Sequence, residues 1–463
     1  MIDLENGLEY EFVSGAIKKA RSSKGKQLIS YTKQIQALDP VKLFASFGKN
    51  QADRIFWGST MDDFYLVGLG SCAEVNDGDK GLPEMEQMIW RMMESASIYN
   101  PFQTHGTGLV AFGGMTFDMK NQHKTLWNNF PHQSLRIPKW VVTKDRQTFY
   151  CTVNTYVTEL DEVYEFVDKI QDEMKALWTG NESLGQNPPL QSKTDIQPGK
   201  WKATVAQAVE EIKYGKAQKI VLAREMNVRL SDQANIGAML NTFRDTQENS
   251  YLFAIECNGD CFIGATPERL VRMDDQRILS TCLAGTISRG ANMEEDEMLK
   301  DRLLQDTKNR KEHDFVVIMI RNALEKYCFD INIPEEPVIY PLKHLQHLYT
   351  PVRATLKKGV CITDIVHTLH PTPALGGVPR EESLRFIREN ELLERGWYGA
   401  PLGWLDSNRN GEFAVSIRSG LVKGDNISLF AGCGIMGESD PEAEYKETKI
   451  KFSPMLSVLE EEK

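Results

Sequence analysis

Two hydrophobic patterns alternate along the chain. Segments in which apolar and polar residues alternate, or in which apolar residues run together between Gly, Asn and Asp, are typical of β-strands. Other segments repeat apolar residues every three or four positions, which is typical of amphipathic helices. Residues 219–230 are predicted to form a strand, and residues 251–257 and 261–264 a hairpin. The mixture predicts an α/β chain.

Helices are predicted at residues 159–178 and 201–214, and a long helix is predicted from residue 292 to residue 328. On this long helix Glu312 shares the apolar side with Val316. A carboxylate in that environment requires a cation or a metal ion as its partner.

The stretch from residue 411 to residue 451 combines both patterns with charged residues. Its predicted elements are a strand at 411–421, a strand at 427–431, a corner at Gly432-Cys433-Gly434, and a helix that begins at the N-cap Ser439. A hairpin that leads into such a corner and a helix start brings backbone N–H donors and charged side chains together.

Three charged residues share one face of this last helix. Glu444, Glu447 and Lys451 are spaced i, i+3 and i+7. They form either a solvated face beside a core stripe, or two carboxylates for a divalent metal ion with a lysine for an anionic ligand. Arg418 favours the second interpretation, because a lone cation in a strand of small and apolar residues needs an anionic partner.

Lys219, Glu268 and His347 each have two interpretations. Lys219 shares one strand face with Val221, so it is either a surface residue with its amine in water or a desolvated base. Glu268 lies on a turn, where it either pairs with a neighbour such as Arg269 or acts as a general acid if burial raises its pKa. His347 is either a hydrogen-bonded core residue or a ligand.

Residues 68–73 match the GxGxxA pattern of dinucleotide-binding proteins. The sequence that follows is acidic and contains glycine, which makes it a poor start for the helix that this fold requires. A glycine-rich turn is therefore predicted at this position.

Composition limits the class of protein. The chain has 463 residues, of which 41% are hydrophobic and 26% charged, and no apolar run is long enough to span a membrane. Its acidic N-terminus differs from a signal peptide, and its eight scattered cysteines predict reduced thiols, so a cytoplasmic protein is expected. The net charge of −11 argues against nucleic-acid binding. An anionic ligand must therefore meet a local cation or metal ion.

Eight motifs together resemble those of the chorismate-utilising enzymes, in that family's order. They are KIVLAR (219–224), TPERL (266–270), LAGT (283–286), KNRKEHDFV (308–316), HPTPALGG (370–377), GEFAVSIRS (411–419), FAGCGI (430–435) and EYKETKIK (444–451). The resemblance is strong over residues 200–459, the expected chorismate-binding catalytic region, and less distinctive over residues 1–199. It implies one structural unit over residues 1–463. The implied fold is α/β (α+β), with two stacked, mainly antiparallel sheets wrapped by helices and an active site in a cleft.

The resemblance also implies roles for the residues at the matching positions. Lys219 is expected to be the general base and Glu268 the general acid. Mg²⁺ is the expected cofactor, held by Glu312 and Glu447 with Glu444 close by. The residues expected to bind the substrate are Arg418, Tyr398, Lys451, Gly432, Gly434, Thr286 and His347.

The expected activity is that of the isochorismate synthases in this family. Chorismate would be converted reversibly to isochorismate by water addition at C2 and loss of the C4 hydroxyl, for menaquinone or catechol siderophore biosynthesis. The amine-transferring members typically lack a lysine at the position of Lys219, and no amidotransferase subunit is expected. The alternatives are a salicylate synthase, which also eliminates pyruvate, and a non-catalytic acidic metal-binding scaffold.

Overall fold

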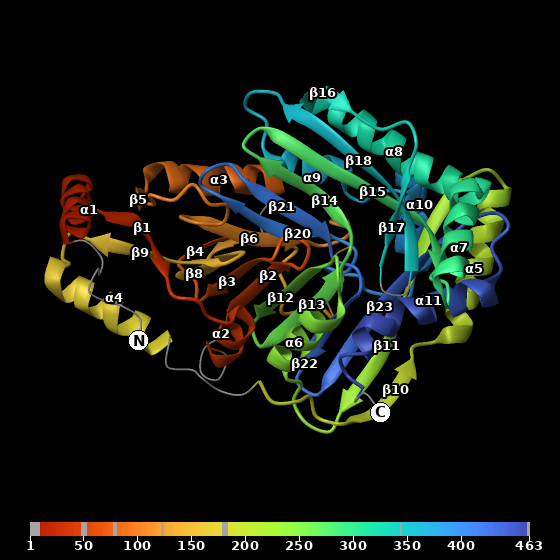
Figure 1. Cartoon of the computed structure of the whole chain (residues 1–463), viewed down its shortest axis with the longest axis horizontal. Helices are drawn as coiled ribbons and strands as arrows, with labels where there is room; N and C mark the ends of the chain where they lie inside the picture. Colours follow the sequence, from red (N-terminus) through yellow and green to blue (C-terminus); the bar gives the residue numbers. More distant parts are fainter. Residues whose placement is uncertain are drawn as a thin grey trace.

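The computed structural model describes residues 10–47, 53–76, 81–121, 125–177, 184–342 and 345–460, which form two large β-sheets surrounded by helices (Figure 1). The larger sheet has 13 strands in the order β10 (Leu190–Asp195), β11 (Lys219–Leu230), β23 (Asn426–Ile435), β22 (Ser419–Lys423), β13 (Asp260–Thr266), β12 (Tyr251–Cys257), β2 (Arg54–Ser59), β3 (Phe64–Leu69), β8 (Trp140–Asp145), β9 (Thr148–Thr158), β1 (Lys26–Ile35) and β5 (Ser97–Tyr99), with β19 (Gly377–Val378) beside β11.

The second sheet has 10 strands in the order β16 (Cys328–Asn332), β18 (Leu345–Leu356), β15 (Arg277–Ser288), β14 (Arg269–Asp274), β21 (Gly411–Val415), β20 (Pro401–Asp406), β6 (Val110–Met115), β7 (Gln133–Ile137) and β4 (Ala73–Asn76), with β17 (Val338–Pro341) beside β18. Among the described strands only the β1–β5 pair is parallel. The predicted fold class, two stacked and mainly antiparallel sheets with helices around them, is confirmed.

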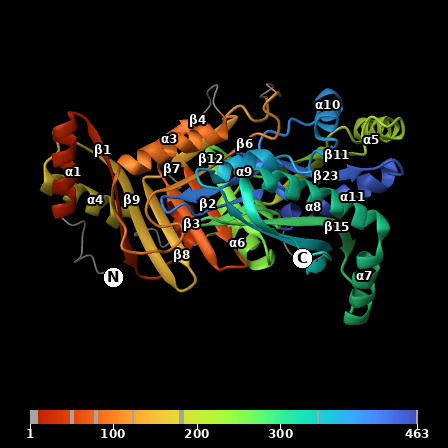
Figure 2. The ribbon, with the colours of Figure 1, turned by 90° about the horizontal axis from the view of Figure 1, so that it is seen from above.

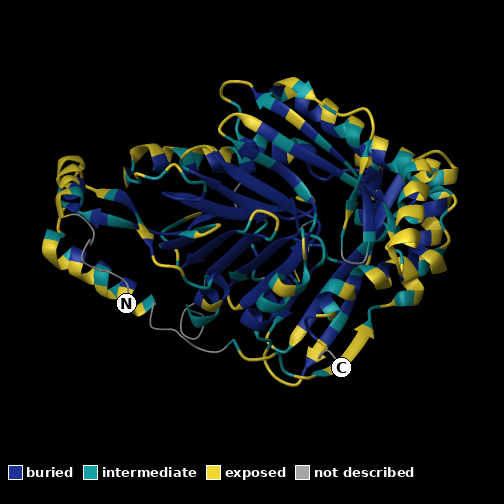
Figure 3. Cartoon of the chain, viewed as in Figure 1, coloured by how far each residue is buried: buried dark blue, intermediate teal, exposed yellow. Residues whose placement is uncertain are grey.

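Eleven helices are present in the described residues: α1 (Tyr10–Ser23), α2 (Pro40–Phe47), α3 (Leu82–Ser95), α4 (Val163–Leu177), α5 (Pro198–Lys213), α6 (Ile236–Thr246), α7 (Met293–Gln305), α8 (Thr307–Tyr327), α9 (Ile362–Leu369), α10 (Arg380–Asn390) and α11 (Pro441–Leu456). Most cover the outer faces of the sheets with their exposed sides outward (Figure 3). Helix α7 instead projects from the body of the molecule (Figure 2). None of the described helices has the length and apolar character that crossing a membrane requires.

The core between the two sheets is built mainly from aromatic side chains. Trp57 and Phe253 come from the 13-stranded sheet, and Phe112 and Trp404 come from the 10-stranded sheet. Buried aromatic side chains remove large apolar areas from water and therefore contribute much of the stabilisation of such an interface. The sheets consequently stack closely in the middle of the molecule, where most residues are buried (Figure 3).

The predicted strand at 411–421 is wrong in one respect, because it is two strands in two different sheets. Strand β21 belongs to the 10-stranded sheet and β22 to the 13-stranded sheet. Between them the Ser416 hydroxyl lies 2.8 Å from the carbonyl oxygen of Ala400, and Arg418 adopts a left-handed backbone conformation with φ +53°. This turn moves the chain from one sheet to the other and places Arg418 between them.

The predicted corner at Gly432–Gly434 is also wrong, because β23 continues through it to Ile435. Gly434 pairs with Val221 of β11, and a Cβ atom on Gly434 would lie 2.6 Å from Cε of Lys219. Gly434 is therefore needed because its missing side chain makes room for the lysine. It does not form the turn that was predicted.

Aspartate caps explain two of the differences between the predicted and the observed helix boundaries. Helix α11 is capped by Asp440, whose carboxylate accepts from the Ala443 N–H at 2.8 Å, while the predicted N-cap Ser439 donates to Glu444 at 2.6 Å. The long helix predicted at 292–328 is divided at Asp306, which caps α8 by accepting from the Asn309 N–H at 2.8 Å. In both cases the aspartate side chain satisfies an N–H group that the helix leaves free.

Arg224 is buried where β10, β11 and α11 meet. Its guanidinium carbon lies 4.2 Å from the ring centre of Tyr445 and 4.7 Å from that of Phe452, and Nη1 lies 2.5 Å from the Asp195 carboxylate. The pair neutralises the arginine charge away from water, so removal of Arg224 loses the ion pair, a hydrogen bond to Thr448 and both aromatic contacts.

Arg224→Ala is therefore expected to lower the free energy of unfolding by about 3–5 kcal/mol, measured by urea denaturation. Arg229 on the same strand makes an exposed pair with Asp425, so Arg229→Ala should cost less than about 1 kcal/mol. Equal effects of the two substitutions would contradict the importance of the buried pair.

Candidate active site

A cavity of about 850 Å³, including the space at its open mouth, lies between the two sheets and helices α8 and α11. Strand β11 contributes Val221 and Ala223 to its wall, and β15 contributes the backbone around Gly285. The chain crossing between β21 and β22 contributes Arg418. Elements from both sheets therefore meet around one enclosed space.

Most of the predicted site residues line this cavity. They are Glu268, Thr286, Glu312, His347, Tyr398, Arg418, Gly432 and Lys451. Lys219 and Gly434 lie directly behind the wall. Lys219 contacts the lining residue Glu312 and fills the space where a side chain of residue 434 would lie. Glu447 contacts the cavity residue Lys451, and Glu444 lies one helical turn before it. The fold thus brings the predicted residues together from segments far apart in the sequence.

Lys219 is 1% exposed and begins β11. Its Nζ lies 2.5 Å from Oε1 of Glu312 on α8. Its backbone carbonyl accepts a hydrogen bond from the Ser383 hydroxyl at 2.8 Å, which holds the start of the strand in place. The amine is buried and neutralised by one carboxylate, so the interpretation of Lys219 as a surface residue is wrong.

Glu268 is buried, and no cation pairs with it among the described residues. Its neighbour Arg269 instead pairs with Glu412, at 2.8 Å, so the predicted alternative of a Glu268–Arg269 pair is wrong. Burial raises the pKa of Glu268 to about 7, although the charges of Arg418 and Lys219 act to lower it. A carboxyl group with this pKa can donate a proton near neutral pH.

Arg418 and Tyr398 both line the cavity, where Arg418 supplies positive charge and Tyr398 a neutral hydroxyl. The Arg418 guanidinium donates to the backbone carbonyl of Lys451 at 3.3 Å, and no carboxylate pairs with it in the described part of the chain. Burial lowers the pKa of Arg418 and raises the pKa of Tyr398. A buried guanidinium without a carboxylate is suited to an anionic ligand, because a carboxylate can bind it through two hydrogen bonds.

His347 is buried near the positive charges of Arg418 and Lys451. Burial, followed by the charges of Arg418 and Lys451, lowers its pKa to about 3. One ring nitrogen, Nδ1, lies 2.9 Å from the Thr286 hydroxyl, and the other, Nε2, has no hydrogen-bond partner among the described residues. The imidazole is therefore neutral at ordinary pH, and its Nε2 atom is free to make a hydrogen bond.

Two of the three predicted metal ligands pair with lysines, and the third, Glu444, has one oxygen without a partner among the described residues. Lys219 pairs with Glu312 and Lys451 pairs with Glu447, at 2.5 Å and 2.6 Å. Burial alone would raise the pKa of Glu312, but Lys219 more than offsets this and the net shift is downward. Burial raises the pKa of Glu444, and its Oε2 atom has no partner in the described residues.

No three His, Cys, Asp or Glu side chains of the described residues are close enough together to form a ready-made metal site. The carboxylate oxygens of Glu312, Glu444 and Glu447 are nevertheless the ligand type that Mg²⁺ prefers. Two of them already face positive charge, and the third has an unused oxygen. The donor set therefore suits a hard divalent cation.

Residues 15–460 match the protein family described as chorismate binding enzyme. The chain belongs to this family. Isochorismate synthase MenF of Bacillus subtilis (strain 168) is 37% identical over 452 residues, which cover 96% of this chain and 96% of that protein. The salicylate biosynthesis isochorismate synthase of Pseudomonas aeruginosa is 32% identical over 447 residues, which cover 96% of this chain and 92% of that protein.

A solved structure of MenF, the menaquinone-specific isochorismate synthase from Escherichia coli, is similar to this chorismate-binding enzyme with a TM-score of 0.79. The two are 22% identical, and the similarity covers 97% of this chain and 100% of that chain. The fold is therefore shared over almost the whole length. Family membership makes the chain an enzyme rather than a non-catalytic scaffold.

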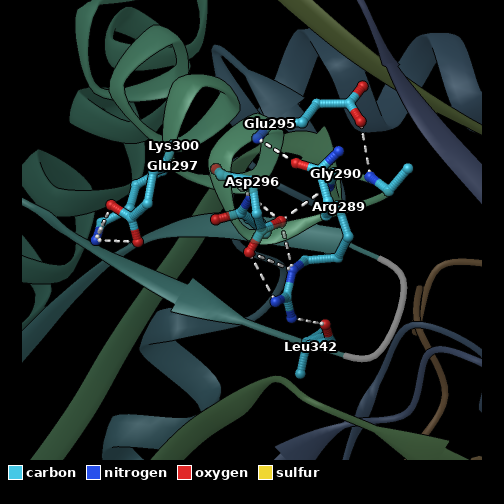
Figure 4. A network of polar contacts seen from close by, with 10 residues as sticks. Arg289, Gly290, Glu295, Asp296, Glu297, Lys300 and Leu342 are labelled. Carbon is cyan, nitrogen blue, oxygen red and sulfur yellow. Dashed lines mark hydrogen bonds and ion pairs between the residues drawn. The ribbon is translucent and has the colours of Figure 1, made fainter.

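A polar network in this chorismate-binding enzyme joins the ends of two strands that line the cavity (Figure 4). Arg289, which follows β15, pairs with Asp296 of α7 at 2.7 Å and donates to the backbone carbonyl of Leu342 at 2.9 Å. Gln346 of β18 donates to the same aspartate at 3.0 Å. The network thereby ties together the strands that carry Thr286 and His347.

Sequence reasoning missed Arg395, which lines the cavity, and its partner Glu391. Arg395 stands in the segment ERGWYGAPLGWL, where it is the one basic residue among glycines and large apolar side chains. A cation in such surroundings is a signal of a buried ion pair, and it could have identified this residue.

Glu268 is expected to titrate near pH 7 in this enzyme. Because its folded pKa is raised, the carboxyl group should be protonated below that pH and ionised above it. Infrared difference spectra recorded across neutral pH should show a protonated carboxyl band that disappears as the pH rises. Glu268→Gln should lack this band, whereas Glu256→Gln, at a carboxylate paired with Arg54, should retain it. An unchanged band in Glu268→Gln would contradict the assignment.

Proposed function

We propose that this chain is an isochorismate synthase, which converts chorismate reversibly to isochorismate. The observation that carries the proposal is a buried lysine and a protonatable carboxyl at one cavity: Lys219 at its wall and Glu268 in it. Lys219 contacts Glu312, which lines the same cavity as Glu268, so both groups lie at one ligand space. The full-length relatives named above as isochorismate synthases support the same activity.

In the proposed reaction Lys219 and Glu268 divide the proton transfers. The Nζ atom of Lys219, as the neutral amine released from its ion pair with Glu312, takes a proton from a water molecule as its oxygen bonds to C2 of chorismate. The ring double bonds shift, the C4–oxygen bond breaks, and the carboxyl group of Glu268 gives its proton to the departing hydroxyl, which leaves as water. The raised pKa of Glu268 supplies this proton near neutral pH.

The other cavity residues bind and orient the substrate. Arg418 and Tyr398 would hold the enolpyruvyl carboxylate, since this guanidinium has no carboxylate partner among the described residues. Lys451 and the backbone at Gly432 and Gly434 would complete the anion site. Thr286 and His347, which also line the cavity, would contribute further hydrogen bonds.

Glu312 and Glu447, with Glu444 nearby, are the residues that would hold Mg²⁺ beside the ring carboxylate. Bound there, the ion would withdraw electron density from the ring as charge develops. In the structure Lys219 and Lys451 neutralise two of these carboxylates, Glu312 and Glu447. The carboxylate oxygens therefore already face a positive charge, as they would face the metal ion.

We further infer that residues 1–463 form one structural unit, because the 13-stranded sheet contains strands from both halves of the chain. A cytoplasmic location is supported by the eight cysteines, which are all free thiols. Chorismate is the proposed small-molecule partner, and the net charge of −11 argues against nucleic acid. Either menaquinone or a catechol siderophore is consistent with the reaction, and the menaquinone route is favoured by resemblance.

The proposed activity is tested by a proton NMR time course of the purified protein with chorismate and Mg²⁺, with and without ammonium. Isochorismate should accumulate until it reaches a stable mixture with chorismate, and a chelator should stop the reaction. Salicylate with equimolar pyruvate would instead indicate a salicylate synthase. An aminated product formed only with ammonium would contradict the role of Lys219, and no conversion would contradict the activity.

Lys219→Ala is expected to lower kcat by about 10²–10⁴-fold, the usual contribution of a general base, while chorismate still binds. Lys219→Arg keeps a cation beside Glu312 but is a poor base, so it should remain folded and be equally slow. Lys216→Ala is the matched control, because Lys216 makes only an exposed pair with Glu211. Turnover in Lys219→Ala at the rate of the control would contradict the assignment.

A further inference from the structure

A second buried ion pair, Glu391 with Arg395, lies against the substrate cavity. The side chains are 2% and 5% exposed, and two hydrogen bonds join them, from Nε at 2.6 Å and from Nη2 at 2.7 Å. Burial of two charges is costly and is compensated only where the geometry and the remaining hydrogen bonds are good. Neither Glu391 nor Arg395 has a role in the proposed reaction.

The hydrogen bonds of the pair lead to the strand that carries the proposed base. Arg395 Nη2 donates to the backbone carbonyl of Val221 at 2.8 Å, and Oε2 of Glu391 accepts from the Ala223 N–H at 2.7 Å. Val221 and Ala223 are two and four residues after Lys219, on the same face of β11. The pair therefore holds β11 from the side at the two positions nearest to the lysine on that face.

Arg395 also holds the opposite side of the cavity. Its Nη1 donates to the backbone carbonyl of Leu375 at 3.0 Å, and its own carbonyl accepts from the Tyr398 N–H at 2.8 Å. Its guanidinium carbon lies 4.1 Å from the ring centre of Phe117, which fixes the plane of the group. Arg395 thus contacts the strand of Lys219 through its guanidinium and the turn of Tyr398 through its backbone carbonyl.

We propose that Arg395, oriented by Glu391, is a positioning residue that sets the place of Lys219 relative to Tyr398 and hence to the bound substrate. This inference rests on the proposed function, since it concerns the same base and the same ligand. Because Glu391 neutralises Arg395, the pair orients the strand without adding net positive charge beside the lysine.

The planar fork of arginine is necessary for this role. It donates simultaneously to one carboxylate and to two backbone carbonyls in fixed directions, whereas the ammonium group of lysine cannot reproduce this geometry. Arg395 also separates the substrate cavity from an outer cavity of about 560 Å³ that contains Glu391 and Phe117. Truncation of Arg395 would join the two spaces, so a substitution that keeps volume and charge is the cleaner test.

Arg395→Lys is expected to lower kcat by about 10- to 100-fold, because small displacements of a reacting group have effects of this size, while the chorismate Kd changes little. Arg388→Lys is the matched control, since Arg388 belongs to α10, pairs with Asp118, and lies outside the substrate cavity. Its kcat should equal that of the wild type. Wild-type kcat in Arg395→Lys, or an equal loss in Arg388→Lys, would overturn the inference.

Two further measurements separate positioning from general stabilisation. In Arg395→Ala, added ethylguanidinium should restore part of kcat and added ethylammonium should not. Rescue by neither ion, or by both, would contradict a role for the planar guanidinium. In Glu391→Ala, amide hydrogen exchange of β11 should become faster at Ala223, and unchanged exchange would overturn the role of Glu391. Exchange does not depend on turnover, so an inactive wild type would contradict only the proposed function.

Discussion

A buried lysine must be neutralised inside the protein, and much of the site is arranged around this constraint. Lys219 reaches the space between the two sheets from β11, and Glu312 reaches it from α8, which packs against β15 of the other sheet. The pair therefore joins elements of both layers. Gly434 has no side chain where Cε of Lys219 must lie, and the Ser383 hydroxyl holds the lysine carbonyl. Neither the glycine at position 434 nor the Ser383 hydroxyl would be needed if the lysine amine lay in water.

The same burial explains opposite behaviour of neighbouring titratable groups. Removal from water disfavours the charged form, so the pKa of Glu268 rises to about 7 and the pKa of His347 falls to about 3. The carboxylates of Glu312 and Glu447 have lysine partners, whereas among the described residues Arg418 donates only to a backbone carbonyl. A chain with a net charge of −11 thus contains a local site with cationic groups for an anionic substrate.

Strand β11 carries several of these constraints at once. Its cavity face presents Lys219, and the next residues on that face are held by the Glu391–Arg395 pair. Arg224, which follows Ala223, is buried between Tyr445 and Phe452 and pairs with Asp195. Three ion pairs thus lie around one strand: Lys219–Glu312, Glu391–Arg395 and Arg224–Asp195. The strand that carries the proposed base is therefore held at its start, at its edge and beside α11.

The sequence by itself determined the local elements and the identity of the site. Alternation of apolar residues predicted β11 with its observed bounds and the β12–β13 hairpin, because strand periodicity is a local property. The motifs predicted the cavity residues, because side chains that bind one substrate keep their types and order along the chain. The predicted roles of these residues remain predictions, as does the single structural unit.

Only the tertiary structure decided how these parts are connected. A strand that changes sheets at Ser416–Arg418 has the same alternation as one that does not. Gly434 leaves room for Lys219, but in the sequence it cannot be told from a glycine in a turn. The partners Glu312, 93 residues from Lys219, and Arg395, far from β11 in sequence, depend on packing between distant segments. Charge neutralisation acts through space, so residue spacing along the chain could not reveal which carboxylate meets which cation.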